Sequence, residues 1–188
     1  GSGFVGYYII RRIVKKGYKI IIPYQRPTNE AKLRLFGSIG QIIPLKFLNI
    51  QDKGITQSIQ SADVVINLKT LWQGKPQFFQ EGIYQFNYNL ISLINRIDKN
   101  KFFIFFSGLA IDKKSSSKRT IVIAETEEYI KKNLKNSIII RPGVIIGGGD
   151  QFLNRLISVF KMFFLIPLFG KGESKLQPVF IDDVAKAI

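Results

Sequence analysis

The chain alternates between two kinds of segment. Short apolar runs, rich in Ile, Val or Phe and bounded by polar residues or by Gly and Pro, are typical of buried parallel strands. They occupy residues 19–24, 41–47, 63–68, 102–107 and 137–141. Longer segments of helical character occupy residues 4–16, 29–36, 77–97 and 118–134. Strand and helix in alternation imply right-handed crossovers, so the pattern predicts an α/β fold with a doubly wound parallel sheet.

A glycine motif stands directly before the first predicted helix. It consists of Gly1, Ser2, Gly3, Phe4, Val5 and Gly6, with the spacing G-x-G-x-x-G. Glycines at this spacing allow a tight turn, a close approach of the backbone to a pyrophosphate, and tight packing of the helix on the sheet. The helix would point its first amides at the phosphates. The motif predicts a dinucleotide site, with a plain glycine-rich turn as the alternative, and we expect the central first strand of the sheet to precede it.

The stretch that follows residues 19–24 lies about twenty residues beyond the motif, where such folds read the ribose of the cofactor. It holds no Asp or Glu to accept the ribose hydroxyls of NAD, whereas Arg26 is suited to pair with a 2′-phosphate. The sequence therefore favours NADP(H) over NAD(H). The alternative is that Arg26 is one more solvated base in a basic protein.

Composition narrows the remaining chemistry. The chain has no Cys and no His, which removes disulfides, the usual zinc sites, thiolate nucleophiles and imidazole bases. The formal net charge of +15 would suit nucleic acid or anionic lipid. The Lys residues are scattered, however, and no nucleic-acid motif accompanies them, so nucleic-acid binding is not predicted. No run of about twenty uncharged apolar residues predicts a spanning helix, and no signal peptide is recognised.

Several motifs recur in this order in one group of proteins. They are the glycine motif, VVINL at 64–68, SGLAID at 107–112, RPGV at 141–144, FLNR at 152–155, IPLFG at 166–170 and QPVFIDDVA at 177–185. Over nearly its whole length the chain resembles the atypical extended short-chain dehydrogenases, which are NAD-dependent epimerase/dehydratase-like proteins. Within them it is most similar to the group that includes the alpha-subcomplex subunit 9 of respiratory complex I and its bacterial relatives.

Active members of this superfamily use a Tyr-x-x-x-Lys pair for catalysis. The Tyr exchanges a proton with the substrate, the Lys lowers its pKa, and a Ser at a strand end orients the carbonyl group. Aligning the acidic stretch at residues 124–127 with the family places Arg119 at the Tyr position and Ile123 at the Lys position. Ser107 remains as a vestigial candidate. The resemblance therefore implies a protein that has lost conventional turnover.

The resemblance also implies further cofactor contacts by position. Asn49 and Ile50 follow the second predicted strand, where the family usually has an Asp and an apolar residue beside the adenine. Asn67 and Leu68 end the third predicted strand, and Lys69 follows in place of a small residue, which we expect to narrow the floor of the pocket. The contacts near the nicotinamide would be Pro142, Gly143 and Val144.

Two regions are expected along the chain. Residues 1–146 would form an NAD(P)-binding Rossmann domain, and residues 147–188 would begin a smaller C-terminal lobe that is cut at its end. The resemblance implies a non-catalytic NADP(H)-binding accessory subunit of respiratory complex I, with complex I subunits as partners. It would be associated with the inner membrane, on the mitochondrial matrix side or the bacterial cytoplasmic side. The alternatives are an active NAD(P)-dependent enzyme acting on a sugar nucleotide or similar substrate, and a regulatory protein that senses NADPH.

One segment near the end is unusually apolar. It begins at Leu156 and ends at Phe169, with Lys161 as its only charge, and it is too short to span a bilayer. Part of it is expected to pack on the sheet. In one interpretation all of it is core of the small lobe. In the other, some of its aromatic residues form an exposed patch with a basic rim that makes peripheral contact with a membrane or a hydrophobic partner. These residues are Phe160, Phe163, Phe164 and Phe169.

Overall fold

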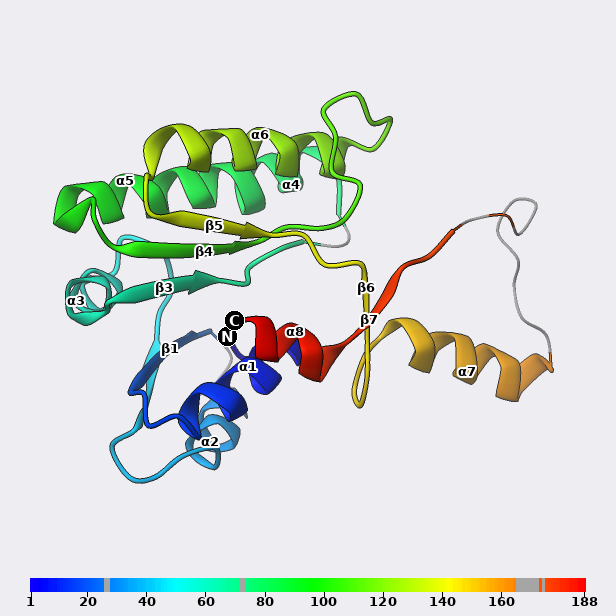
Figure 1. The fold of residues 1–188 in the computed structure, drawn as a ribbon, viewed down its shortest axis with the longest axis horizontal. Helices are drawn as coiled ribbons and strands as arrows, with labels where there is room; N and C mark the ends of the chain where they lie inside the picture. Colours follow the sequence, from blue (N-terminus) through cyan, green and yellow to red (C-terminus); the bar gives the residue numbers. More distant parts are fainter. Residues whose placement is uncertain (26–27, 72–73, 165–172, 174) are drawn as a thin grey trace.

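The computed structural model describes residues 1–25, 28–71, 74–164, 173 and 175–188, and Figure 1 shows the path of the chain. The strands are β1 (Ile20–Tyr24), β2 (Ile42–Lys46), β3 (Val64–Asn67), β4 (Phe102–Phe106), β5 (Ser137–Ile140), β6 (Val144–Ile146) and β7 (Pro178–Phe180). The helices are α1 (Phe4–Val14), α2 (Thr28–Arg34), α3 (Lys53–Ser61), α4 (Pro76–Phe79), α5 (Phe86–Asp98), α6 (Lys118–Asn133), α7 (Phe152–Phe163) and α8 (Ile181–Ala187), and a π-helix, η1 (Gln80–Gln85), joins α4 to α5. The five predicted strands are β1 to β5, and each begins and ends within one residue of its predicted bounds.

All paired strands of the described chain run parallel, which confirms the predicted α/β class. β1 pairs with β2, β4 lies between β3 and β5, and β6 pairs with β7. Among the described strands, β1 and β3 are not hydrogen-bonded to each other. The predicted sheet is therefore divided into separate groups of strands at this point.

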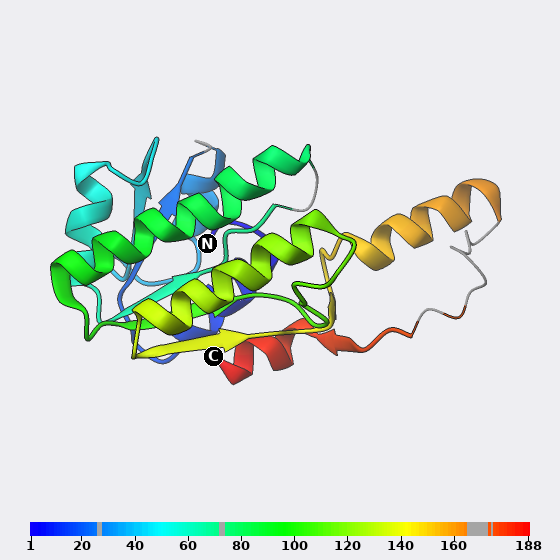
Figure 2. The same ribbon diagram turned by 90° about the horizontal axis from the view of Figure 1, so that it is seen from above.

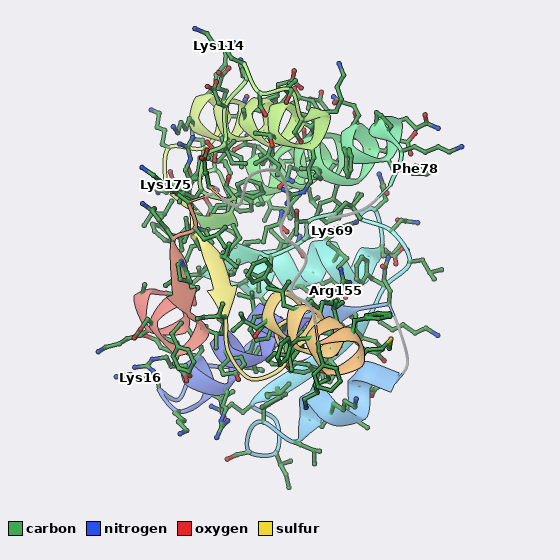
Figure 3. The ribbon with its side chains drawn as sticks, turned by 90° about the vertical axis from the view of Figure 1, so that its right-hand side faces the viewer. Lys16, Lys69, Phe78, Lys114, Arg155 and Lys175 are labelled. Atoms are coloured by element: carbon green, nitrogen blue, oxygen red, sulfur yellow. The ribbon has the colours of Figure 1, made fainter. Side chains whose placement is uncertain are left out.

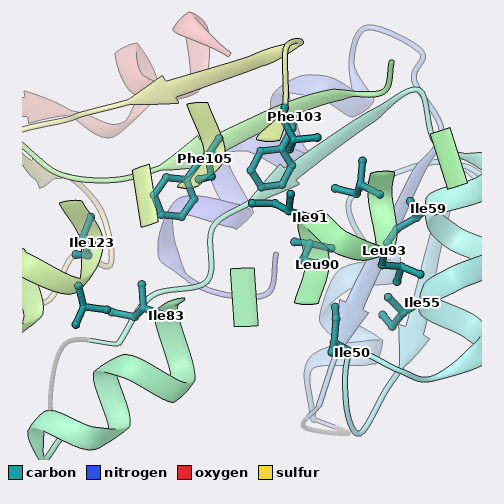
Figure 4. Packing of buried hydrophobic residues seen from close by; sticks show 14 residues of the cluster. Ile50, Ile55, Ile59, Ile83, Leu90, Ile91, Leu93, Phe103, Phe105 and Ile123 are labelled. Carbon is teal, nitrogen blue, oxygen red and sulfur yellow. The ribbon is translucent and has the colours of Figure 1, made fainter. Parts of the chain in front are cut away.

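The central strand β4 is buried on both faces. Phe103 and Phe105 point into the cluster of buried side chains beneath α5 and α6, which Figure 4 shows from close by. Ile104 and Phe106 point to the other face, into a cluster that includes residues of α1 and α8. Successive side chains of a strand alternate between its faces, so a strand covered by helices on both sides needs an uninterrupted apolar run. Figure 2 shows α5 and α6 side by side over the sheet.

Helix α1 joins the two groups of strands. Ile9 packs in the cluster that contains Ile104 of β4, whereas the next residue, Ile10, packs in a separate cluster with Ile22 of β1. One helix thus covers the end of β1 and the face of β4. Because the glycine motif leads into α1, these contacts fix the position of the motif relative to both groups of strands.

Three of the four segments predicted as helices are single helices, α1, α2 and α6. The segment predicted as one helix over residues 77–97 consists instead of α4, η1 and α5, because a π-helical turn interrupts it. Helix α3 was not predicted. Its buried residues are Ile55 and Ile59, whose spacing of four places them on one face of a helix. This spacing is the signal that could have found it.

The end of the chain returns to the sheet. β7 pairs with β6, and α8 then packs on α1, with Ile181 and Val184 in the same cluster as Ile9. Asp182 and Asp183 lie in the first turn of α8, where negative charge complements the helix dipole. The last residues of the expected small lobe therefore contact the nucleotide-binding layer directly.

Helix α7 extends away from the rest of the molecule (Figure 1). None of its residues is buried, and Phe163 and Phe164 are 61% and 80% exposed. Among the described residues the expected packing on a sheet is limited to the contact of α7 with β6; residues 165–169, with Phe169, lie outside the described part. Phe160, Phe163 and Phe164 do not form core. Of the helices in the described chain, none is long and apolar enough to cross a membrane.

Candidate functional site

The segments that follow β1, β2 and β3 meet around one cavity of about 240 Å³. Gln25 follows β1, Asn49 and Ile50 follow β2, and Lys69 follows β3. The other lining residues are Phe47, Leu48, Gln51, Glu81, Gln85, Phe86 and Asn89. Amide side chains share this lining with the apolar residues Phe47, Leu48, Ile50 and Phe86, a mixture that offers a flat base both contact surface and hydrogen-bond partners. The structure thus brings the two predicted adenine contacts after β2 into one cavity.

The ribose-reading stretch is only partly described, because Arg26 lies outside the described residues. Gln25 donates a hydrogen bond from Nε2 to the carbonyl oxygen of Leu48 at 3.3 Å, which links the ends of β1 and β2. The first carboxylate after β1 is Glu30, on α2. It accepts hydrogen bonds from the Tyr24 hydroxyl and from Arg34. Glu30 is thus engaged by its neighbours on β1 and α2.

The glycine motif has the geometry that a pyrophosphate needs. A Cβ atom on Gly6 would lie 1.9 Å from the carbonyl oxygen of Gly1, so only glycine lets the start of α1 pack against the loop. A Cβ atom on Gly3 would meet nothing within 4 Å, so this part of the backbone faces open space. Gly3 is also the N-cap of α1, with no side-chain cap, and the first turn carries no acid. The first amides of the helix are therefore left for an anionic ligand.

The motif lies between the ends of β1 and β3. A Cβ atom on Gly1 would lie 2.9 Å from Cγ2 of Ile22 on β1. Phe4 and Val5 pack in the same cluster as Leu68, the residue that follows β3. Ser2 is half-buried within the loop. All six predicted residues of the motif thus stand at the gap between the two groups of strands.

A buried pair of amides fixes the end of β3. Asn67 donates from Nδ2 to Oδ1 of Asn87 on α5 at 2.6 Å, and Asn87 donates from Nδ2 to the carbonyl oxygen of Ile83 at 2.7 Å. The Asn67 Oδ1 in turn accepts from the backbone N–H of Lys69 at 2.9 Å. The predicted residue Asn67 therefore holds the backbone at the floor of the cavity and does not line it.

Ser107 points at a buried carboxylate. Its hydroxyl donates to Oε1 of Glu127 on α6, which is 2% exposed. Arg141, directly after β5, also binds Glu127, with Nε donating to Oε1 at 2.9 Å. This hydrogen bond raises the pKa of the Arg141 guanidinium. Because its proton is directed to Glu127, Ser107 acts in this structure as part of a structural network.

Arg119, which the resemblance aligns with the catalytic Tyr, links α6 to the segment after β3. Its Nε donates to the carbonyl oxygen of Leu71 at 2.6 Å, and Nη2 donates to Oγ1 of Thr70 at 3.1 Å. Partial burial lowers the pKa of its guanidinium. Ile123, at the Lys position, is buried in the core beneath α5 and α6. Neither residue can act as a proton donor near neutral pH, since a guanidinium stays protonated and an alkyl group has no proton to give.

The predicted contacts on the nicotinamide side surround the start of β6. The carbonyl oxygen of Pro142 accepts from the backbone N–H of Leu109 at 2.9 Å, which joins the segments after β4 and β5. A Cβ atom on Gly143 would lie 1.9 Å from the carbonyl oxygen of Gln177, so this glycine is needed for packing against the strand before α8. Val144 is the first residue of β6.

Sequence reasoning missed the residues that hold the site together. Glu127, Arg141 and Asn87 were not singled out, and their partners lie 14 to 20 residues away along the chain. A second and larger hollow of about 600 Å³ lies against η1 and α6, with Tyr84, Tyr129 and Glu128 in its wall. None of the predicted cofactor contacts lines that hollow.

Comparison with known proteins agrees with this geometry. The model of the NAD dependent epimerase/dehydratase family matches residues 1–129. The NADH dehydrogenase (ubiquinone) 1 alpha subcomplex subunit 9 of Mus musculus is 32% identical over 193 residues, which covers 100% of this chain and 50% of that protein. The subunit of the same name from Arabidopsis thaliana is 29% identical, with 100% of this chain and 47% of that protein covered. The chain thus spans about half the length of these relatives.

A solved structure supports the fold. The PhqB reductase domain from Penicillium fellutanum superposes with a TM-score of 0.77 at 16% identity, over 100% of this chain and 60% of that one. At this identity the likeness concerns the fold alone, a nucleotide-binding Rossmann fold. The family match over residues 1–129 shows that the chain belongs to the NAD dependent epimerase/dehydratase family, whose members bind a nicotinamide dinucleotide.

Proposed function

We propose that this chain is the nucleotide-binding part of a non-catalytic accessory subunit of respiratory complex I, and that it holds NADP(H). One observation carries the proposal. A glycine loop suited to a pyrophosphate opens α1, while Arg119, bound to Leu71 and Thr70, and the buried Ile123 stand at the positions that the resemblance gives to the catalytic Tyr and Lys. Such a protein retains the binding of the family and lacks its proton transfer.

The residues present fit a dinucleotide. Gly3 leaves the backbone open toward the phosphates, the uncapped start of α1 supplies amides, and Asn49 and Ile50 line the cavity for the base. The bound cofactor would supply hydride chemistry to an active relative. In this chain the same residues would bind and orient it, and Pro142 to Val144 would border its nicotinamide end.

The preference for NADP(H) rests on the residues after β1. No carboxylate precedes Glu30 there, and Glu30 is held by Tyr24 and Arg34. A carboxylate bound in this way is less available to the ribose hydroxyls of NAD. Arg26 would then pair with the 2′-phosphate.

The alternative is an active epimerase, dehydratase or reductase, which the family match favours in general. It requires a proton donor in the cleft, and general acid–base catalysis commonly contributes two to four orders of magnitude. Ser107 is the remaining catalytic candidate, and its hydroxyl donates a hydrogen bond to Glu127. This contact argues against turnover.

The assembly to which the protein would belong is inferred from its named relatives. Two relatives are named as mitochondrial subunits of NADH dehydrogenase, and this likeness supports the proposal that the protein belongs to complex I at the inner membrane. The side would be the mitochondrial matrix or the bacterial cytoplasm. The regulatory alternative, a free NADPH sensor, would not associate with the complex.

Helix α7 would contribute a peripheral contact with anionic lipid. Its exposed aromatic residues carry the apolar area, and Arg155 and Lys161 are exposed on the same helix. Apolar side chains beside basic ones are typical of helices that lie in a membrane interface. The change Phe163→Ser with Phe164→Ser is expected to reduce sedimentation with vesicles of anionic phospholipid, while Phe78→Ser, 47% exposed on α4, serves as the control. Unchanged sedimentation of the double variant would remove the lipid contact.

The function as a whole is tested by two measurements on the purified protein and its host. A tagged copy is expected to co-purify with complex I subunits, and the purified protein is expected to bind NADPH and to transfer no hydride from it. Absence of complex I from the purified material would contradict the accessory role. Steady oxidation of NADPH that Ser107→Ala abolishes would favour the enzyme instead.

A further inference from the structure

We propose that Lys69 selects the ligand of the cavity by placing its positive charge against a phosphate on the adenosine half of the nucleotide. This inference rests on the proposed dinucleotide-binding function and adds to it a specificity-determining residue. Lys69 is the second residue after β3 and lines the cavity.

Contacts hold both the backbone and the side-chain ammonium group of Lys69. Its backbone N–H donates to Asn67, which the buried Asn87 holds in place. Its Nζ lies 3.8 Å from the centroid of the Phe86 ring, a cation–π contact. Both Lys69 and Phe86 line the 240 Å³ cavity. The ammonium group is therefore directed into the cavity by its backbone tether and by the ring.

The charge of Lys69 has no counter-ion among the described residues. It takes part in none of the ion pairs found there, and Glu81, which lines the same cavity, lies beyond ion-pair distance from it. Although Lys69 as a whole is exposed, partial burial of its ammonium group lowers its pKa. A partly desolvated cation without a counter-ion favours an anionic ligand.

The phosphate that Lys69 would meet is the one on the ribose 2′ oxygen. Gln25 is the first residue after β1, in the stretch where the fold reads the 2′ position, and it lines the same cavity as Lys69. The pyrophosphate would bind elsewhere, at the glycine loop between β1 and β3. The carboxylate of Glu81 would repel a phosphate. The net preference for a 2′-phosphate therefore depends on the balance between attraction by Lys69 and repulsion by Glu81.

Calorimetry with two adenosine fragments tests this assignment. The probes are 2′,5′-ADP and 5′-AMP, which differ only by the 2′-phosphate, and the proteins are the wild type, Lys69→Met and Lys69→Arg. The control is Lys16→Met, an exposed lysine that Figure 3 shows far from Lys69. Lys69→Met is expected to bind 2′,5′-ADP about tenfold more weakly, as for the loss of one charge-assisted contact, and 5′-AMP within about twofold of the wild type. Lys69→Arg and Lys16→Met are expected to keep the wild-type preference.

The outcomes separate the two proposals. If wild-type protein binds 2′,5′-ADP and Lys69→Met binds it equally well, Lys69 does not read the phosphate, while the proposed function stands. Equal weakening of both fragments by Lys69→Met would also overturn the inference, because it would show a role in packing. If the wild type binds neither fragment and no NADPH, the proposed function itself is wrong. Unchanged circular dichroism and thermal midpoint establish that each variant is folded.

Discussion

Strand β4 and helix α7 are both rich in phenylalanine but lie in opposite environments. β4 reads FFIFF, and its last four residues are buried. α7 reads FLNRLISVFKMF, and none of its residues is buried. The strand lies between β3 and β5 and has helices on both faces. In the described chain, the main contact of α7 is with β6. Apolar composition therefore predicts burial only where the topology supplies neighbours on each side.

The difference in burial suggests different roles for the two elements: β4 contributes to stability, whereas α7 is free to contact a partner. The residues of β4 stabilise the sheet whose ends carry the nucleotide site, and their substitution should unfold the protein. The residues of α7 contribute little to folding in this structure, so they are available for contact with a membrane. Substitutions in the two elements should therefore affect different measurements.

The largest effect is expected from Phe103→Ala in β4. Phe103 is 0% exposed, and truncation of a buried Phe costs roughly 3–5 kcal/mol through lost transfer energy and the cavity left behind. Phe163→Ala in α7 should change the free energy of unfolding by about 0.5 kcal/mol or less, as at other exposed sites. Urea denaturation compares the two variants. A similar loss of unfolding free energy in both variants would show that α7 is packed in solution and would contradict the contrast between α7 and β4.

The next effect concerns a buried charge in the sheet layer. Glu127→Ala removes the acceptor of Ser107 and Arg141, and the loss of these charge-assisted bonds should destabilise the protein by roughly 2–3 kcal/mol. The neighbouring Glu128 pairs with Lys113 on the surface. Glu128→Ala should therefore cost about 0.5 kcal/mol or less. Thermal melting at neutral pH distinguishes them, and equal midpoints would mean that the Glu127 network does not form.

The strands of the sheet could be predicted from the sequence, but the buried polar residues that hold the strand ends could not. β1 to β5 were found because burial on both faces leaves uninterrupted apolar runs such as FFIFF, and the glycine motif was found because its spacing is local. Glu127 and Asn87 were missed because a polar residue is buried only when distant partners satisfy it. For α7 the sequence left open the choice between core and an exposed patch, since periodicity does not say which neighbours cover a helix.

A smaller effect should separate two glycines of the motif. Gly6→Ala places a Cβ atom 1.9 Å from the Gly1 carbonyl oxygen and should cost roughly 1–3 kcal/mol by overpacking. Gly3→Ala meets no neighbour, so it should change stability by less than about 1 kcal/mol while it weakens NADPH binding by obstructing the phosphates. Denaturation and calorimetry measure the two effects. Full NADPH affinity in Gly3→Ala would place the phosphates elsewhere.

The smallest effect is a pH dependence of 2′,5′-ADP binding. Burial lowers the pKa of Lys69, so its charge is lost at a lower pH than the charge of a solvated lysine as the pH rises. A bound phosphate favours the ammonium form, so binding takes up protons in this range. Affinity for 2′,5′-ADP should fall toward alkaline pH in the wild type and stay flatter in Lys69→Met; parallel profiles would exclude Lys69 as the titrating group.

The central claim is that the cleft binds NADP(H) without performing chemistry. The most direct test is to titrate the purified protein with NADPH and with NADH by calorimetry and to follow the absorbance of the reduced nicotinamide in the same samples. We predict tighter binding of NADPH than of NADH and a constant absorbance for both. Tighter binding of NADH, or steady loss of the reduced nicotinamide at a rate that depends on the protein concentration, would contradict the account.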